Sequence, residues 1–107
     1  MGSLYLLVAR FVGAFSMSRL SRLARESVML MSANDRKAYI MLYQVTKALF
    51  RSKTDLLTVI KAMLDAVDLA YTSSSEDILY VTIDCQVYLI TLHVRCDGKW
   101  LCDFVTQ

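Results

Sequence analysis

The alternation of apolar and polar positions over residues 78–105 predicts an antiparallel β-sheet at the end of the chain. Side chains of a strand point to opposite faces in turn, and this period of two runs through three segments separated by turn-forming residues. The first turn lacks glycine, so the pattern alone places it at Cys85-Gln86, with Ile83 opposite Tyr88. The segment is therefore predicted to be a three-stranded meander.

The second hairpin is predicted from Asp97-Gly98, because this dipeptide suits the positive φ angles of a two-residue turn. A turn of that length pairs Arg95 with Trp100 and determines the faces of the last strand. The face predicted to point inward comprises Leu79, Val81, Ile83, Tyr88, Ile90, Leu92, Val94, Leu101, Asp103 and Val105. The face predicted to point outward comprises Ile78, Tyr80, Thr82, Val87, Leu89, Thr91, His93, Arg95, Trp100, Cys102 and Phe104.

The predicted outward face is too apolar for ordinary contact with water. A sheet that exposes one face normally alternates apolar with polar residues, and tryptophan and arginine are typical anchors of protein interfaces. The residues predicted to bind a partner are Tyr80, Leu89, Arg95, Trp100 and Phe104. This face therefore predicts a non-enzymatic protein–protein interaction module. The module would form a homodimer, or it would act as a small adaptor or inhibitor of another protein. The alternative is that the first or second helix folds over this face.

Three helices are predicted before the sheet, at residues 4–31, 34–50 and 55–71, from apolar positions spaced three and four apart. Ser32 and Ser52 each stand three residues before an aspartate, in the pattern of a helix N-cap. The predicted fold class is therefore α+β, with three N-terminal helices packed on a C-terminal three-stranded antiparallel meander. Residues 1–107 are predicted to be one domain, helical over residues 4–71 and a meander over residues 78–106, joined by a polar run.

Composition narrows the class of protein but indicates no activity. Of the 107 residues, 56% are hydrophobic and 21% charged, which excludes a disordered chain. The apolar run at residues 4–17 is interrupted by Arg10 and is too short to span a membrane. A mean hydropathy of +0.43 favours association with a second copy or another protein. Three cysteines without a CxxC pair indicate an intracellular protein, cytoplasmic or, from its Arg- and Ser-rich N-terminus, mitochondrial.

The arginine side of the first helix is an alternative binding surface. Arg19, Arg22 and Arg25 stand three apart, a spacing that can track phosphates of a nucleic acid or an acidic surface. The net charge of +2 is too small to indicate nucleic-acid binding by itself, and no known nucleic-acid motif accompanies the arginines. The simplest interpretation is a solvated helix face.

The sequence contains little that points to catalysis. His93 and Cys102 are cross-strand neighbours in the predicted register, but no nearby residue would orient them or hold an oxyanion. The histidine and three cysteines are spread over both faces and a turn, which does not suit zinc. We predict no catalytic residue, metal or cofactor. The hairpin at residues 97–100 resembles the last strands of nuclear-transport-factor-2-like domains, which implies a pocketed, enzymatic alternative, although the order of elements departs from that family.

Overall fold

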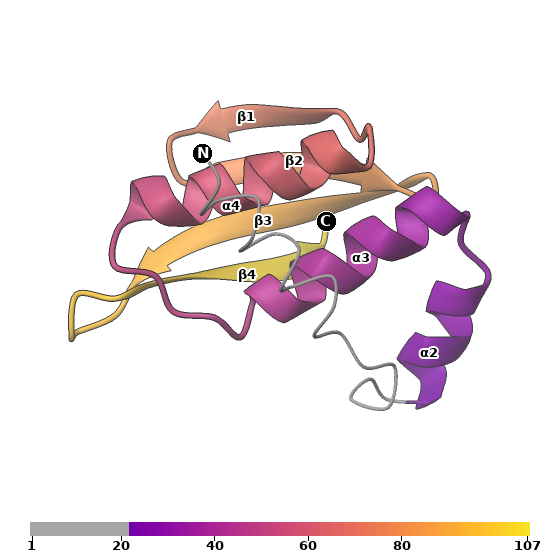
Figure 1. Cartoon of the computed structure of the whole chain (residues 1–107), viewed down its shortest axis with the longest axis horizontal. Helices are drawn as coiled ribbons and strands as arrows, with labels where there is room; N and C mark the ends of the chain where they lie inside the picture. Colours follow the sequence, from indigo (N-terminus) through magenta and orange to yellow (C-terminus); the bar gives the residue numbers. More distant parts are fainter. Residues whose placement is uncertain (1–21) are drawn as a thin grey trace.

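The computed structural model describes residues 22–107, which form an α+β domain of two layers (Figure 1). The elements are α2 (Arg22–Met29), α3 (Ala33–Val45), α4 (Lys53–Ala66), β1 (Tyr71–Ser75), β2 (Ile78–Ile83), β3 (Gln86–Val94) and β4 (Trp100–Thr106). The strands form one antiparallel sheet in the order β1-β2-β3-β4. Helices α3 and α4 cover one face of this sheet, and α2 packs against α3 (Figure 1). Within the described range, no helix has the length and apolar character needed to cross a membrane.

The helix starts predicted by the capping pattern are confirmed. Ser32 and Ser52 are the N-caps of α3 and α4, and each hydroxyl accepts a hydrogen bond from the N–H three residues on, at 3.2 and 3.1 Å. The second helix ends earlier than predicted, because Phe50 exchanges two backbone hydrogen bonds of 2.8 Å with Trp100. Of the predicted helix at residues 4–31, only α2 and the turn after it lie within the described residues.

The sheet has four strands, so the prediction of three is wrong. Helix α4 ends after Ala66, and Asp68 takes a left-handed conformation with a φ of 57° that ends the helical path. The predicted third helix at residues 55–71 therefore extends too far, and residues 72–75 of the polar run after it belong to β1, while Glu76 and Asp77 form the turn to β2. Tyr71 of β1 lies opposite Val81 of β2, so the sheet begins where the helical part was expected to end. Pairing with β2 outweighs the weak strand signal of a serine-rich segment.

The turn between β2 and β3 lies one residue earlier than predicted, at Asp84-Cys85. Both residues have a positive φ, 53° and 62°, which is typical of the type I′ turn that fits the twist of paired strands. Ile83 therefore pairs with Gln86 instead of Tyr88. Because the pairing shifts by two residues, every side chain of these strands stays on its predicted face.

The turn between β3 and β4 reverses the faces of the last strand. The Gly98 N–H donates to the carbonyl of Arg95 at 2.9 Å, and the Arg95 N–H donates to the carbonyl of Lys99 at 2.7 Å. With Gly98 at a φ of 83°, this is a three-residue loop with a glycine bulge, one residue longer than predicted. Trp100 consequently lies opposite Val94 rather than Arg95. A shift of one residue moves every β4 side chain to the other face.

The reversal changes which β4 side chains join the core. The residues that lie on the inner face, against the prediction, are Trp100, Cys102 and Phe104. The residues that lie on the outer face, against the prediction, are Leu101, Asp103 and Val105. The largest fully buried side chains come from α3, α4 and the inner sheet face and include Met41, Leu42, Leu56, Ile60, Met63, Leu64, Leu79, Ile83 and Ile90.

Candidate protein-interaction face

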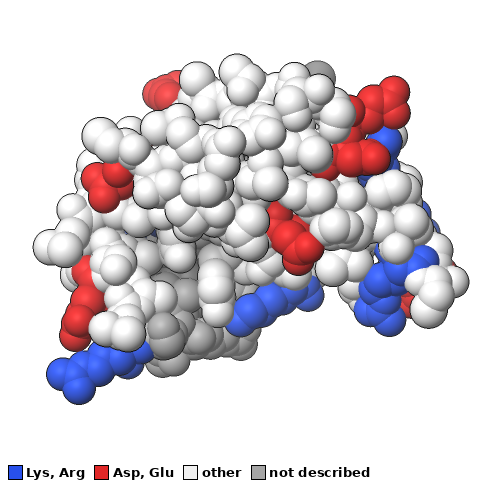
Figure 2. Space-filling view, turned by 180° about the vertical axis from the view of Figure 1, so that it is seen from behind, with Lys and Arg blue, Asp and Glu red and all other residues white. Residues whose placement is uncertain are grey.

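The side of the sheet away from the helices presents a mainly apolar surface, which we call the outer face. It consists of the outward side chains of β2, β3 and β4, namely Ile78, Tyr80, Thr82, Val87, Leu89, Thr91, His93, Leu101, Asp103 and Val105. Alternation along each strand places them there, since their neighbours in sequence point toward α3 and α4. Figure 2 shows this side of the molecule, where uncharged residues fill most of the middle and Lys and Arg lie toward the margins.

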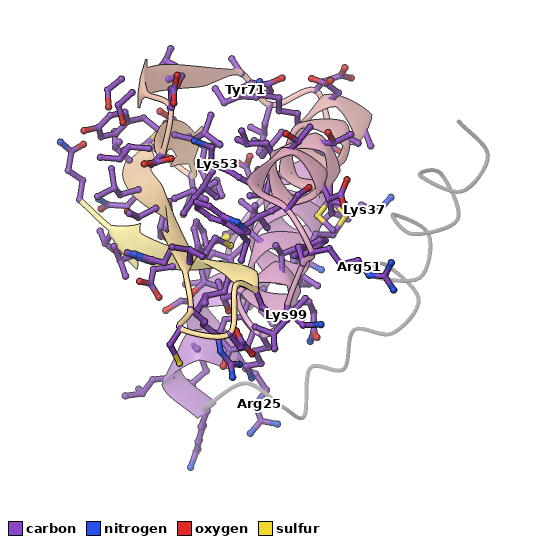
Figure 3. The ribbon with its side chains drawn as sticks, turned by 90° about the vertical axis from the view of Figure 1, so that its left-hand side faces the viewer. Arg25, Lys37, Arg51, Lys53, Tyr71 and Lys99 are labelled. Atoms are coloured by element: carbon purple, nitrogen blue, oxygen red, sulfur yellow. The ribbon has the colours of Figure 1, made fainter. Side chains whose placement is uncertain are left out.

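Among the described residues, no helix covers the outer face. Helices α3 and α4 lie on the opposite side of the sheet, as the view along the sheet in Figure 3 shows. The predicted alternative, in which the first or second helix folds over the predicted outward face, holds in part: α3 covers Phe104 of that face through Tyr39, but it does not cover Tyr80 or Leu89. Helix α2 packs against α3. An apolar sheet face is normally buried by a second layer. The outer face lacks that layer in the described part of the chain.

Cross-strand pairing gathers the apolar side chains into a continuous row. Tyr80 lies opposite Leu89, and Leu89 lies opposite Val105, so three strands contribute to one row. Val105 is 49% exposed, while Tyr80 and Leu89 are half-buried by their neighbours. Ile78 and Leu101 flank this row on β2 and β4. The apolar surface thus crosses the sheet rather than following a single strand.

His93 and Asp103 form the polar part of the outer face. His93 Nε2 lies 2.7 Å from Asp103 Oδ2, and the two side chains are 46% and 59% exposed. They are diagonal neighbours, because His93 is paired with Leu101 and Asp103 with Thr91. Asp103 therefore does not point into the core as predicted, and it pairs with a histidine of the neighbouring strand. When the imidazole is protonated, this contact is a charge-assisted hydrogen bond.

Trp100 and Phe104, both predicted to bind a partner, pack on the inner face instead. The Phe104 ring stacks on Tyr88 with centroids 4.7 Å apart, and Tyr39 of α3 meets it edge-on at 5.4 Å. Burial raises the pKa of both tyrosine hydroxyls, Tyr39 and Tyr88. The Trp100 ring packs against the core, with Lys53 Nζ 5.7 Å from its centroid. These aromatic residues connect the helical layer to the sheet.

Arg95 does not contact Trp100 as predicted. Its side chain is exposed at the hairpin turn, where Arg95 Nη2 lies 3.3 Å from Asp97 Oδ2. The cation beside Trp100 is Lys53, which also donates a hydrogen bond of 2.9 Å to Asp77. That hydrogen bond is the main reason that the pKa of Lys53 is raised. Of the predicted partner-binding residues, only Tyr80 and Leu89 form part of the outer face as defined by pairing.

The predicted basic face falls only partly within the described residues. Arg19 lies outside them, while Arg22 and Arg25 lie on α2. Arg22 Nε is 3.4 Å from Glu26 Oε1, an exposed pair of the kind that contributes little to stability. Figure 3 shows Arg25 near α2 and Lys37 on the helical side, so these two basic side chains project from different parts of the molecule. Nucleic-acid binding through the arginines stays a prediction.

The cysteines are not arranged for paired chemistry within the described residues. Cys102 is 1% exposed, and burial, with a smaller effect of the Asp103 charge, raises its pKa to about 12. Its thiol is therefore protonated near neutral pH. His93 points to the opposite face, so the predicted contact between them is wrong. Cys85 and Cys96 are exposed at the two hairpin turns. Over residues 22–107, no group of three His, Cys, Asp or Glu side chains is placed to hold a metal ion.

Sequence reasoning missed Leu101, Asp103 and Val105 as members of the outer face. Asp97-Gly98 suits a two-residue turn, but it also suits a three-residue loop in which only the glycine is left-handed. One signal was available. The two-residue turn places the Asp103 carboxylate among core residues, where unpaired charges are rare. Lengthening the loop by one residue removes that conflict.

The chain has no significant match among protein-family models, curated proteins or solved structures.

Proposed function

We propose that the chain is a non-enzymatic protein-interaction module that associates with a second copy of itself through the outer face. The observation that carries this proposal is the row formed by Tyr80, Leu89 and Val105, which no helix covers in the part of the chain that the structure describes. A twofold pair places one patch against itself, so both copies cover their apolar rows in a single contact. Another protein with an apolar surface would fit the same face, which is the adaptor or inhibitor form of the proposal.

The size of the outer face indicates a weak and reversible dimer. Strands about 4.8 Å apart, rising about 3.3 Å per residue, make a face of roughly 15 by 20 Å. This plan area is well below the roughly 800 Å² that each partner buries in an interface of standard size. We therefore expect a dissociation constant in the micromolar range or weaker, about 1 µM or above.

The direct test is solution mass by light scattering, with protein from about 10 µM to about 1 mM, at low and high salt. Wild-type mass should rise from monomer to dimer with concentration. The rise should depend little on salt, because the contact is mainly apolar. Leu89→Lys places a charge at the centre of the row and should keep the chain monomeric over the whole range. Thr58→Lys adds the same charge at an exposed position on α4, in the other layer, and should behave as wild type.

Two results would contradict the proposal. One is a monomer at every concentration. The other is a dimer that Leu89→Lys leaves unchanged, which would place the contact elsewhere. Association that high salt abolishes would instead support the arginine side of the first helix and an acidic partner.

Replacing Trp100 separates the outer face from the inner face. Because Trp100 packs against the core, Trp100→Ala should lower the free energy of unfolding by about 2 kcal/mol or more. Association of the folded fraction should stay as in wild type. A variant that loses association but keeps its unfolding midpoint would mean that Trp100 belongs to the interface.

A further inference from the structure

The His93–Asp103 pair lies on the outer face at the hairpin end of β3 and β4, next to the apolar side chains of Leu101 and Val105. Leu101 lies directly opposite His93, and Thr91 lies directly opposite Asp103. The pair of Leu89 and Val105 follows on the same face of these two strands. Each side chain is about half exposed, at 46% and 59%, so both are accessible to a partner laid against this face. A dimer built on the apolar row would therefore bring these charged groups into the contact as well.

We propose that the twofold axis of the dimer passes over this pair, so that His93 of each copy meets Asp103 of the other, and that protonation of His93 strengthens association. The inference rests on the dimer proposed above. An axis that lies between the two sheets and is perpendicular to the line from His93 to Asp103 reverses that line in the second copy. Imidazolium then lies over carboxylate twice. The charges of one copy are then complementary to those of the other, so the partner that fits this arrangement is a second copy of the chain.

The direction of the pH dependence follows from the charges in the contact. With His93 protonated, the four groups alternate in sign and each carboxylate has two cationic neighbours. With His93 neutral, two Asp103 carboxylates share a partly desolvated contact with no cation between them, which disfavours association. Association therefore takes up protons at His93 and strengthens as the pH falls.

His93 is the only histidine of the chain, and histidine is the side chain that normally changes charge between about pH 5 and pH 8. The other charged groups at this end of the sheet are Arg95 and Asp97, which pair with each other at 3.3 Å, and Lys99, which stands two residues before Leu101 and as a residue type changes charge at a pH well above about 8. Neither Arg95 nor Asp97 lies between His93 and Asp103. Since no described helix packs over the outer face, no group from another element faces His93 there. A pH dependence of association in this range can therefore be assigned to one residue.

The test is the dimer dissociation constant by sedimentation equilibrium at about pH 5.5 and about pH 8. Wild type should bind about tenfold more tightly at the lower pH, the effect expected for two partly exposed ion pairs. His93→Gln keeps a hydrogen-bonding side chain without a titrating group and should remove the difference between the two pH values. Asp103→Asn should do the same. The exchange variant, His93→Asp with Asp103→His, keeps the alternation of charge and should recover the pH dependence that each single change removes.

The outcomes separate this inference from the function on which it rests. A wild-type chain that is monomeric at both pH values overturns the dimer itself. A dimer whose dissociation constant is equal at both pH values, and equal in His93→Gln, overturns the role of the pair and leaves the apolar contact standing. An exchange variant that remains insensitive to pH would mean that the two residues do not meet across the axis. Circular dichroism of each variant at both pH values shows whether a loss reflects unfolding.

Discussion

The register of β4 can be tested through the reactivity of Cys102. The three-residue loop turns this thiol inward, where it is 1% exposed, whereas a two-residue turn would place it outward beside His93. Burial raises its pKa from 9.0 to about 12, so near neutral pH its thiolate population falls by about a thousandfold. Cys85 and Cys96 are exposed and serve as internal references. We therefore expect two thiols to react quickly with a small alkylating reagent and Cys102 to react about a thousandfold more slowly, or more slowly still.

The assay is timed alkylation of the native chain followed by peptide mass mapping, at a concentration low enough to keep the chain monomeric. All three thiols should react at similar rates in denaturant. A second variant reverses the geometry, because Leu101→Cys combined with Cys102→Val places the thiol on the outer face and should restore fast alkylation. The reasoning is refuted if native Cys102 reacts within about tenfold of Cys85 and Cys96, since a buried, protonated thiol cannot do so.

Two further predictions concern stability. Gly98→Ala should destabilise the fold by about 1–2 kcal/mol, because Gly98 has a φ of 83° and the open space around a new Cβ makes the effect conformational rather than steric. Thermal unfolding should show a midpoint roughly 4–8 °C lower per kcal/mol, with Gly98→Asn closer to wild type, and an unchanged Gly98→Ala midpoint would contradict the bulge. Stability should also fall as the pH rises from about 9 toward about 12. Burial raises the pKa of Cys102, Tyr39 and Tyr88 in the folded state, so the unfolded chain loses these protons at a lower pH than the folded chain does. Deprotonation therefore favours the unfolded chain over this range. Urea unfolding against pH should show this loss, and Cys102→Ala should reduce its slope; an equal slope in that variant would count against a buried thiol.

Local signals in the sequence were sufficient for the helix starts and for the faces of two strands. Ser32 and Ser52 form their caps within four residues, so no distant contact is needed to predict them. The faces of β2 and β3 follow from the alternation of apolar and polar residues along each strand. The observed pairing differs from the predicted one by two residues, an even number, so the misplaced turn leaves each side chain on its predicted face. Tyr80 and Leu89 are therefore outward in both the prediction and the structure, and this half of the candidate site was visible in the sequence.

Tertiary structure decided the last strand, the first strand and the rest of the site. Asp97-Gly98 fits loops of two lengths, and the choice between them was made by which β4 face packs against α3 and α4. Burying Cys102 and Phe104 leaves Leu101 and Val105 outward, so an odd shift of one residue exchanged half of the candidate site. Strand β1 has little strand propensity of its own and exists because β2 offers it a row of backbone partners. Propensity and period are local properties of a chain, whereas the length of a loop and the pairing of an edge strand depend on what the rest of the fold buries.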